Sequence, residues 1–470
     1  MSTEDSRSST TMVLVTIFIL LVSMALFAPA GYAQIGLKTY TGSFTDGSTY
    51  LLEVPAKWNG TLLLFSHGTA PPGVPNPPAN TSDTLTRIYL LSNGYALAGS
   101  SYATTGWAVE SAFKDQLAVL DTFTKTVGVP KRTIAWGGSM GGLITAGLVQ
   151  NHPDRFAGAV AFCGLLGGGV GLWNEFLDSA FVFKTLLASD SSLQLDHIEK
   201  PIQNIQLGEQ LLSTAQTTLQ GQARIALTAA MYDTPGWDGS PGPQPPKDYA
   251  VREFNQFTAL QGFPFQLFFG IRTDLEHHAR GNPSWNTGVD YRKQLELSVD
   301  YEEVQALYKK AGLSLDTDLQ ALNNATRIAG DAEAIQFLAQ NIAFNGDIKV
   351  PVLTVHTIGD DIATVELEQS YGAIVAAAQN DSLLRQTYIH RAGHCNFTSA
   401  ENIAALETLI RRLDTGEWKN TDQKDLNDLA LSLPRAYDSL FPGSGYVAPA
   451  FVSYRPAPFL RPFYITNAMH

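Results

Sequence analysis

Short apolar segments that predict buried strands alternate with segments of helical periodicity through the first third of this 470-residue chain. The predicted strands lie at 37–44, 49–54, 61–65, 95–100, 133–136 and 156–162, and helices are expected at 81–92 and 109–126. A seventh and an eighth strand are expected at 350–355 and 383–389, with helices at 367–378 and 402–413. This alternation, with apolar runs bounded by Gly and Pro, predicts a mostly parallel sheet covered by helices on both faces.

The alternation stops after Cys163 and resumes only near Val350. Hardly any strand signal lies between these points, and the apolar residues there have helical spacing. We therefore expect an α/β core formed by residues 34–163 and 348–414, with a helical insertion at 164–347. The remaining residues, 415–470, are expected to wrap the core, because they end in an extended tail rich in aromatic residues and proline.

The first 33 residues form a separate unit. Met12–Phe27 is almost wholly apolar, and small residues follow up to Ala33. This pattern is typical of a signal peptide (residues 1–33) that is cleaved after Ala30 or Ala33. The alternatives are a retained membrane anchor at 12–33 and a buried core helix. Either of the first two readings places the body outside the cytoplasm, secreted or at the outer face of the membrane, and a membrane is a partner only if the segment is retained.

Composition excludes several classes of protein. Lys and Arg number 31 against 44 Asp and Glu, and no basic block is present, so no nucleic-acid partner is expected. With 44% hydrophobic and only 16% charged residues, the chain is not of the disordered class. Two cysteines are too few for a disulfide scaffold or a zinc finger. His277 and His278 fit no zinc-binding spacing, and neither a metal nor a cofactor is predicted.

The strand at 133–136 leads directly into Gly137-Gly138-Ser139-Met140-Gly141, which opens the next helix. A serine at the tip of a sharp strand-to-helix turn needs neighbours almost without side chains, because the turn closes only if they leave room. The helix N-terminus also favours negative charge that develops nearby. Ser139 is therefore the predicted nucleophile, and the alternative is an ordinary glycine-rich turn.

A serine nucleophile needs a base, and loops at the carboxyl ends of parallel strands meet at one edge of the sheet. His394 lies in such a loop and is the predicted base, whereas His390, at the strand end, is expected to be structural. The loop after the strand at 350–355 carries Asp360 and Asp361. Asp360 is predicted to orient His394. Asp361 is the alternative, and the pair also fits a solvated turn.

The nucleophile, the acid and the base follow one another along the chain in the order expected for the α/β-hydrolase superfamily. Residues 36–163 and 348–413 resemble a secreted serine esterase or lipase of this superfamily. Residues 164–347 would then be a large helical lid between the sixth and seventh strands. The resemblance implies a carboxylic ester hydrolase that works through an acyl-enzyme.

The same resemblance assigns roles to the segment Ser66-His67-Gly68-Thr69. It is similar to the oxyanion loop of the superfamily. The backbone N–H of Thr69 would pair with that of Met140, the residue after the nucleophile, to hold the oxyanion. His67 would then be structural.

In this topology Cys163, at the end of the sixth strand, and Cys395, directly after His394, lie near the same edge of the sheet. A disulfide between them is predicted, which export would allow, and the alternative is two separate buried thiols. Tannases and fungal feruloyl esterases resemble this chain in having a cysteine after the catalytic histidine. Their partner cysteine precedes the nucleophilic serine, where this chain has Gly138.

The insertion indicates the class of substrate. Trp173 and Phe176 are expected to line an apolar pocket, unless they only form the core of the insertion. The glycine-rich segment 164–171 is interpreted as a hinge or as a place where substrate passes close to the backbone. An apolar cover favours an uncharged, medium to large ester, small-molecule or polymeric: an aryl or acyl ester, a lactone or a polyester. The alternatives are a serine peptidase of the same fold and an inactive binding protein, and the oligomeric state stays open.

Overall fold

The computed structural model describes residues 36–238, 246–440 and 444–464, so the predicted signal peptide lies outside the described residues. Nine strands form one sheet in the order β1-β2-β4-β3-β5-β6-β7-β8-β9. They are β1 (Lys38–Ser43), β2 (Thr49–Val54), β3 (Thr61–Ser66), β4 (Ala96–Ser100), β5 (Arg132–Gly138), β6 (Gly158–Phe162), β7 (Val352–Gly359), β8 (Leu384–Ala392) and β9 (Phe451–Val452). The pairs from β4 to β8 are parallel, and the pairs at the two edges are antiparallel.

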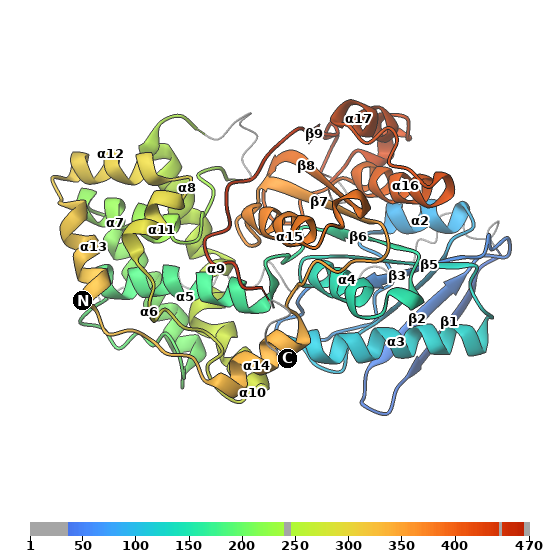
Figure 1. Ribbon diagram of the computed structural model, residues 1–470, viewed down its shortest axis with the longest axis horizontal. Coiled ribbons are helices and arrows are strands. Elements are labelled where there is room, and N and C mark those ends of the chain that lie inside the picture. Colours follow the sequence, from blue (N-terminus) through green and yellow to red (C-terminus); the bar gives the residue numbers. More distant parts are fainter. Residues whose placement is uncertain (1–35, 239–245, 441–443, 465–470) are drawn as a thin grey trace, which may run out of the picture.

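The central strands are buried along their length, as expected for continuous apolar runs. Every residue of β3, β4 and β6 is buried because helices cover both faces of the sheet. One face packs against α3 (Val109–Thr126), α4 (Met140–Asn151) and α15 (Glu366–Ala377). The other packs against α2 (Thr84–Ser92), α16 (Ser399–Thr415) and α17 (Gln423–Leu431), as Figure 1 shows. The predicted α/β fold with a mostly parallel sheet is confirmed.

Between β6 and β7 the described chain contains helices and no strand. They are α5 (Gly168–Leu187), α6 (Pro201–Ala215), α7 (Leu219–Ala230), α8 (Tyr249–Gln261), α9 (Phe263–Gln266), α10 (Arg272–Ala279), α11 (Tyr291–Leu297), α12 (Tyr301–Ala311), α13 (Leu315–Asn324) and α14 (Ala332–Asn341), with a π-helical turn at 267–271. α5 runs from the edge of the sheet into this helical layer (Figure 1). None of the helices in the described ranges has the length and apolar character that a membrane span requires.

The glycine-rich segment at 164–171 packs against the C-terminal tail. Its second half already forms the first turn of α5. A Cβ at Gly171 would lie 2.8 Å from the carbonyl oxygen of Arg461, and a Cβ at Gly167 would lie 3.0 Å from the ring of Phe459. The segment that passes close to this backbone is therefore the protein's own C-terminal tail, and a hinge at these glycines stays a prediction.

The C-terminal segment ties the insertion to the core. β9 pairs with β8, and the chain then crosses to α5, as the dark red trace in Figure 1 shows. There the side chain of Phe459 is buried, and Arg461 forms an ion pair with the buried Asp178 of α5. Arg461 also donates a hydrogen bond to the carbonyl oxygen of Trp285, across 2.9 Å. These contacts fix one side of the insertion against the sheet.

Candidate active site

Ser139 lies at the sharp turn between β5 and α4. Its backbone has φ 60° and ψ −129°, a conformation that costs a non-glycine residue about 1–3 kcal/mol. The flanking glycines make the turn possible. A Cβ at Gly137 would lie 2.3 Å, and a Cβ at Gly141 1.9 Å, from the carbonyl oxygen of Ser66 in β3. The turn therefore places Ser139 at the carboxyl edge of the sheet.

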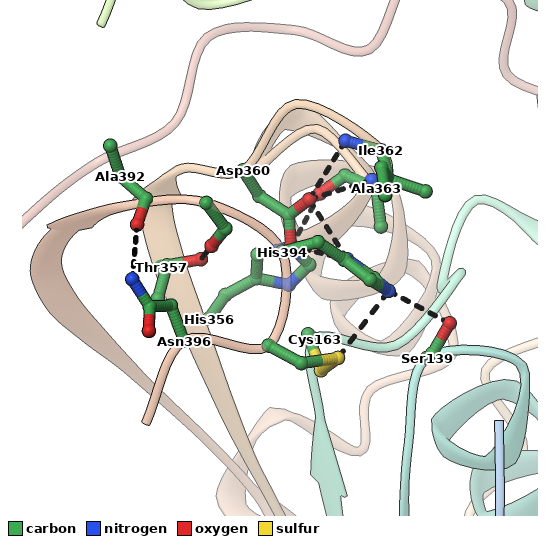
Figure 2. A network of polar contacts seen from close by, with 12 residues as sticks. Ser139, Cys163, His356, Thr357, Asp360, Ile362, Ala363, Ala392, His394 and Asn396 are labelled. Carbon is green, nitrogen blue, oxygen red and sulfur yellow. Dashed lines mark hydrogen bonds and ion pairs between the residues drawn. A yellow bond between two sulfur atoms is a disulfide. The ribbon is translucent and has the colours of Figure 1, made fainter. Parts of the chain in front are cut away.

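The structure brings Ser139, His394 and Asp360 together. The hydroxyl of Ser139 donates to Nε2 of His394 across 2.8 Å. Nδ1 of His394 donates to Asp360, at 2.9 Å from Oδ1 and 2.8 Å from Oδ2. His394 follows β8 and Asp360 follows β7, two adjacent parallel strands that end at this edge (Figure 2). Of the two candidate aspartates, it is Asp360 and not Asp361 that contacts the imidazole ring.

The Asp360 carboxylate is buried and held from several sides. Its Oδ1 accepts hydrogen bonds from the backbone N–H groups of Ile362 (3.0 Å) and Ala363 (2.8 Å). Burial alone would raise the pKa of this carboxyl, but the neighbouring His394 and His356 lower it below its ordinary value. Asp360 is therefore ionised at neutral pH, as an acid that orients an imidazole must be.

The loop after β3 lies directly against the nucleophile. A Cβ at Gly68 would lie 3.2 Å from the Cβ of Ser139, and the hydroxyl of Thr69 points to Sδ of Met140, 3.6 Å away. Thr69 and Met140, whose N–H groups are the predicted oxyanion donors, are therefore neighbours beside Ser139. Their assignment as donors stays a prediction.

His67 belongs to the frame of this loop. Its ring stacks on Tyr102 with the ring centroids 3.9 Å apart, and its two nitrogens face the carbonyl oxygens of Gly68 (2.7 Å) and Ser101 (3.2 Å). The hydroxyl of Tyr102 donates back to the carbonyl oxygen of His67 across 3.1 Å. Burial lowers the pKa of His67. These contacts fit the structural role expected for this residue.

Cys163 and Cys395 form a disulfide, which confirms the predicted pairing. The N–H of Cys163 donates to the carbonyl oxygen of Val355 in β7 across 2.8 Å. Sγ of Cys395 lies 3.4 Å from Nε2 of His394. A Cβ at Gly138 would lie 3.6 and 3.8 Å from the two sulfurs. The disulfide therefore lies within van der Waals distance of the residue that precedes the nucleophile.

Cys163, Cys395 and His394 also form a cluster of potential metal ligands within the described residues. Cysteine binds metals as a thiolate, and the two sulfurs are bonded to each other. The group therefore does not fit a metal centre.

Ser139 opens on one side into a small apolar pocket of about 30 Å³ between the core and the insertion, which we call the acyl pocket. It is lined by Thr69, Gly106, Trp107, Ser139, Leu165, Leu172, Trp173, Phe176, Phe263, Leu267, Ile271 and Ile362. Trp173 and Phe176 thus lie where they were predicted. Their ring centroids are 5.2 Å apart, and Phe176 also packs on Phe268, so both residues belong to the core of the insertion as well.

A second space, which we call the wide cleft, meets Ser139 from the side of the disulfide and has a volume of about 380 Å³. It is lined by Phe65, His67, Gly68, Ala79, Thr81, Ser82, Trp136, Gly137, Gly138, Ser139, Phe162, Cys163, Cys395, Phe397 and Asn402. Gly138 contributes no side chain, which leaves this side of the nucleophile open. Ser139 therefore lies at the junction of two mainly apolar spaces.

Several residues of the site were missed in the sequence analysis. Trp107, in the loop between β4 and α3, lines the acyl pocket, and so do Phe263, Leu267 and Ile271, which the packing of the insertion brings to Ser139. His356 and Glu368, which lie behind Asp360, were also missed. One signal for His356 is present in the sequence, since it is a histidine at the end of an apolar strand, four residues before the acid.

The chain is similar to known hydrolases in sequence and in fold. Residues 95–167, which include Ser139, match the model of the prolyl oligopeptidase family. Over 438 residues the chain is 31% identical to the o-phthalyl amidase of Xanthobacter agilis, an alignment that covers 86% of this chain and 93% of that protein. Feruloyl esterase B from Aspergillus oryzae is similar in structure, with a TM-score of 0.44, 14% identity and coverage of 82% of this chain and 81% of that chain. The chain belongs to the family of the o-phthalyl amidase within the α/β-hydrolase superfamily, and it is a serine hydrolase.

Proposed function

We propose that the protein hydrolyses an uncharged carboxylic ester through an acyl-enzyme on Ser139. The observation that carries this proposal is the continuous path of hydrogen bonds from Ser139 through His394 to Asp360. His394 accepts the proton of Ser139 while Oγ attacks the carbonyl carbon, and it then gives this proton to the leaving alcohol. Water attacks the acyl-enzyme in the same way and releases the acid.

The neighbouring groups have defined roles in this proposal. The N–H groups of Thr69 and Met140 hold the negative oxygen of the tetrahedral intermediate, which is commonly the largest catalytic contribution. Met140 is the first residue of α4, so the positive end of the helix dipole lies at the same place. Asp360 keeps the proton of the neutral imidazole on Nδ1 and stabilises the imidazolium that forms.

The acyl pocket supports an uncharged acyl group. Its lining contains no Lys, Arg, Asp or Glu, so a charged acyl group would lose its hydration there without gaining a partner.

The name of the relative supports a second candidate, an amidase. That protein is described as an o-phthalyl amidase. A phthalyl group carries a carboxylate next to the scissile carbonyl, and the acyl pocket of this chain has no cationic side chain to receive it. We therefore favour a neutral acyl group over a phthalyl group. The main alternative substrate is therefore an amide of such a neutral acid.

The wide cleft supports a bulky leaving group. During the reaction the alcohol departs while the acyl group stays bonded to Ser139, so the alcohol needs the more accessible of the two spaces. Phe65, Phe162 and Phe397 give this cleft an aromatic wall. A serine peptidase is not favoured, because neither space is lined by an acidic side chain that would bind a substrate amine.

A matched panel of chromogenic substrates tests the proposed function. We expect p-nitrophenyl benzoate and butyrate to have higher kcat/KM values than the p-nitroanilides of the same acids. The benzoyl ester should also exceed the 2-carboxybenzoyl ester, because the latter brings a charge into the acyl pocket. Equal or faster cleavage of the anilides would overturn the ester assignment, and a preference for the 2-carboxybenzoyl ester would overturn the neutral acyl group.

Enlarging the acyl pocket is expected to change its preference for chain length. Phe263 is half-buried and lines the pocket, so Phe263→Ala should raise the ratio of kcat/KM for p-nitrophenyl octanoate over the acetate roughly tenfold. Phe257→Ala is the control, since Phe257 is also half-buried but does not line the pocket. The same shift in both variants would contradict the assignment of this space to the acyl group.

We also propose that the protein acts outside the cytoplasm. The disulfide beside His394 supports this, because disulfides persist in oxidising compartments. N-terminal sequencing of the mature protein from the native host tests the proposal. A new N-terminus at residue 31 or 34 is expected. An intact N-terminus in the membrane fraction would instead support an anchor at residues 12–33.

A further inference from the structure

A second histidine lies directly behind Asp360. His356 is in β7, four residues before Asp360, and both side chains are inaccessible to solvent. Nε2 of His356 lies 3.5 Å from Oδ2 of Asp360 and donates to the carbonyl oxygen of Ala363 across 2.6 Å. Nδ1 faces Oε1 of Glu368 at 3.2 Å. Figure 2 shows His356, Asp360, His394 and Ser139 in one continuous network.

Glu368 is itself fixed in place. It lies in the first turn of α15, and its side chain is inaccessible to solvent. Its Oε2 accepts hydrogen bonds from the hydroxyl of Thr354 (2.6 Å) in β7 and from Nε2 of Gln386 (2.7 Å) in β8. Both groups are donors to Glu368, so the carboxylate is bound as an acceptor and is left to accept from His356 as well.

The contacts of His356 define its charge. One ring nitrogen faces a backbone carbonyl and the other a carboxylate, and both of these groups only accept hydrogen bonds. A neutral imidazole has a single N–H, so the lone pair of its other ring nitrogen would face one of these acceptor oxygens without a hydrogen between them. Burial opposes protonation, but the hydrogen bonds and charges of Asp360 and Glu368 outweigh it and raise the pKa of His356 to about 10. His356 is therefore a buried cation between two carboxylates.

We propose that His356, held by Glu368, is a positioning residue that fixes the orientation of Asp360 and offsets part of its negative charge. The inference rests on the proposed roles of Ser139, His394 and Asp360. With His356 in place, Asp360 is held on one oxygen by backbone N–H groups and on the other by the two histidines. The carboxylate cannot turn away from His394, and its attraction for a proton on His394 is reduced.

The titratable groups near His356 are acidic, apart from His394, the proposed base. Asp360 and Asp361 lie in the loop after β7, and Glu366 and Glu368 lie in α15. His394 lies beyond Asp360. Removal of His356 alone would therefore leave several carboxylates without their cation, and the protein could fail to fold. The test must remove the cation and one carboxylate together.

The double variant with His356→Gln and Glu368→Gln replaces both charges by amides that still form hydrogen bonds. Without the cation, Asp360 attracts a proton on His394 more strongly, and protonated His394 is no longer a base. His356 contacts Asp360 directly, whereas Glu368 contacts His356, so the loss of the cation outweighs the loss of the second carboxylate at Asp360. We therefore expect the acid limb of the pH profile of kcat/KM for p-nitrophenyl butyrate to move to higher pH. The ratio of kcat/KM in the variant to kcat/KM in the wild type should be several-fold lower at pH 6 than at pH 8.5.

The control is the ion pair of Arg224 and Asp318, whose residues line neither space beside Ser139. The variant with Arg224→Gln and Asp318→Asn should be destabilised but keep the acid limb of the wild type. If the limb stays in place in both double variants, His356 is only a stabilising residue and the proposal is overturned.

A second measurement needs no variant and no substrate. In ¹⁵N NMR of the histidine-labelled wild type, one imidazole should keep both nitrogens protonated at pH 8, where an ordinary histidine is neutral. Nine neutral histidines at this pH would overturn the proposal. Because this readout does not depend on activity, it separates a failure of the proposed charge on His356 from a failure of the proposed hydrolase mechanism.

Discussion

Replacing Ser139 with alanine is expected to lower kcat for p-nitrophenyl butyrate roughly 10⁴- to 10⁶-fold. The change removes the only atom that forms the acyl-enzyme while leaving the oxyanion donors and both substrate spaces in place. The left-handed backbone at this position is unfavourable for alanine as for serine, so the free energy of unfolding should change little. Stopped-time assays with purified protein measure the loss.

The control for this variant is Thr145→Val on the same helix, α4. The hydroxyl of Thr145 is buried and has no hydrogen-bond partner among the described residues, so its removal should leave both activity and stability close to wild type. A fluorophosphonate probe should label the wild type and Thr145→Val, but not Ser139→Ala. Retained hydrolysis by Ser139→Ala after removal of contaminating esterases would refute the acyl-enzyme mechanism.

The second large effect is expected from Asp360→Asn, with a loss of kcat of about 10⁴-fold. The amide turned toward His394 as a donor would stabilise the tautomer with the proton on Nε2, and this tautomer cannot accept the proton of Ser139. In the wild type, Asp360 has a lowered pKa and is ionised throughout the neutral range. The Asn variant therefore lacks this negative charge at every pH at which the enzyme is assayed. The defect should therefore persist across the pH profile.

Asp361→Asn is the matched comparison, because it makes the same isosteric change one residue further along the chain. We expect its kcat to stay within about tenfold of the wild type, since the imidazole of His394 is held by Asp360. Equal losses in the two variants would show that the loop as a whole, and not the contact between Asp360 and His394, is required.

Much of this site could be predicted because its geometry follows from local patterns. The central strands are continuous apolar runs, and parallel strands end at one edge of a sheet, so loops that are distant in sequence must meet there. Ser139, Asp360 and His394 were found from their place in these loops. The pairing of Cys163 with Cys395 followed from the same topology.

The walls of the site could not be predicted in this way. Phe263 reaches the acyl pocket only through the packing of helices in the insertion, and no short-range pattern records which helices meet. The role of Gly167 and Gly171 could not be predicted for the same reason, because the segment that they accommodate is the distant C-terminal tail. His356 is a charged residue within a buried strand, and the carboxylates that make this possible come to it from the following loop and from α15.

The disulfide also has a consequence for the order in which the protein folds. Cys163 and Cys395 are 232 residues apart, and the whole insertion and β7 lie between them. Closing so long a loop costs chain entropy, which the packing of the intervening residues must offset before the two thiols can meet. Oxidation of this pair is therefore expected late in folding. Trapping free thiols at intervals during oxidative refolding would time the moment at which the loops after β6 and β8 come together, without any substrate.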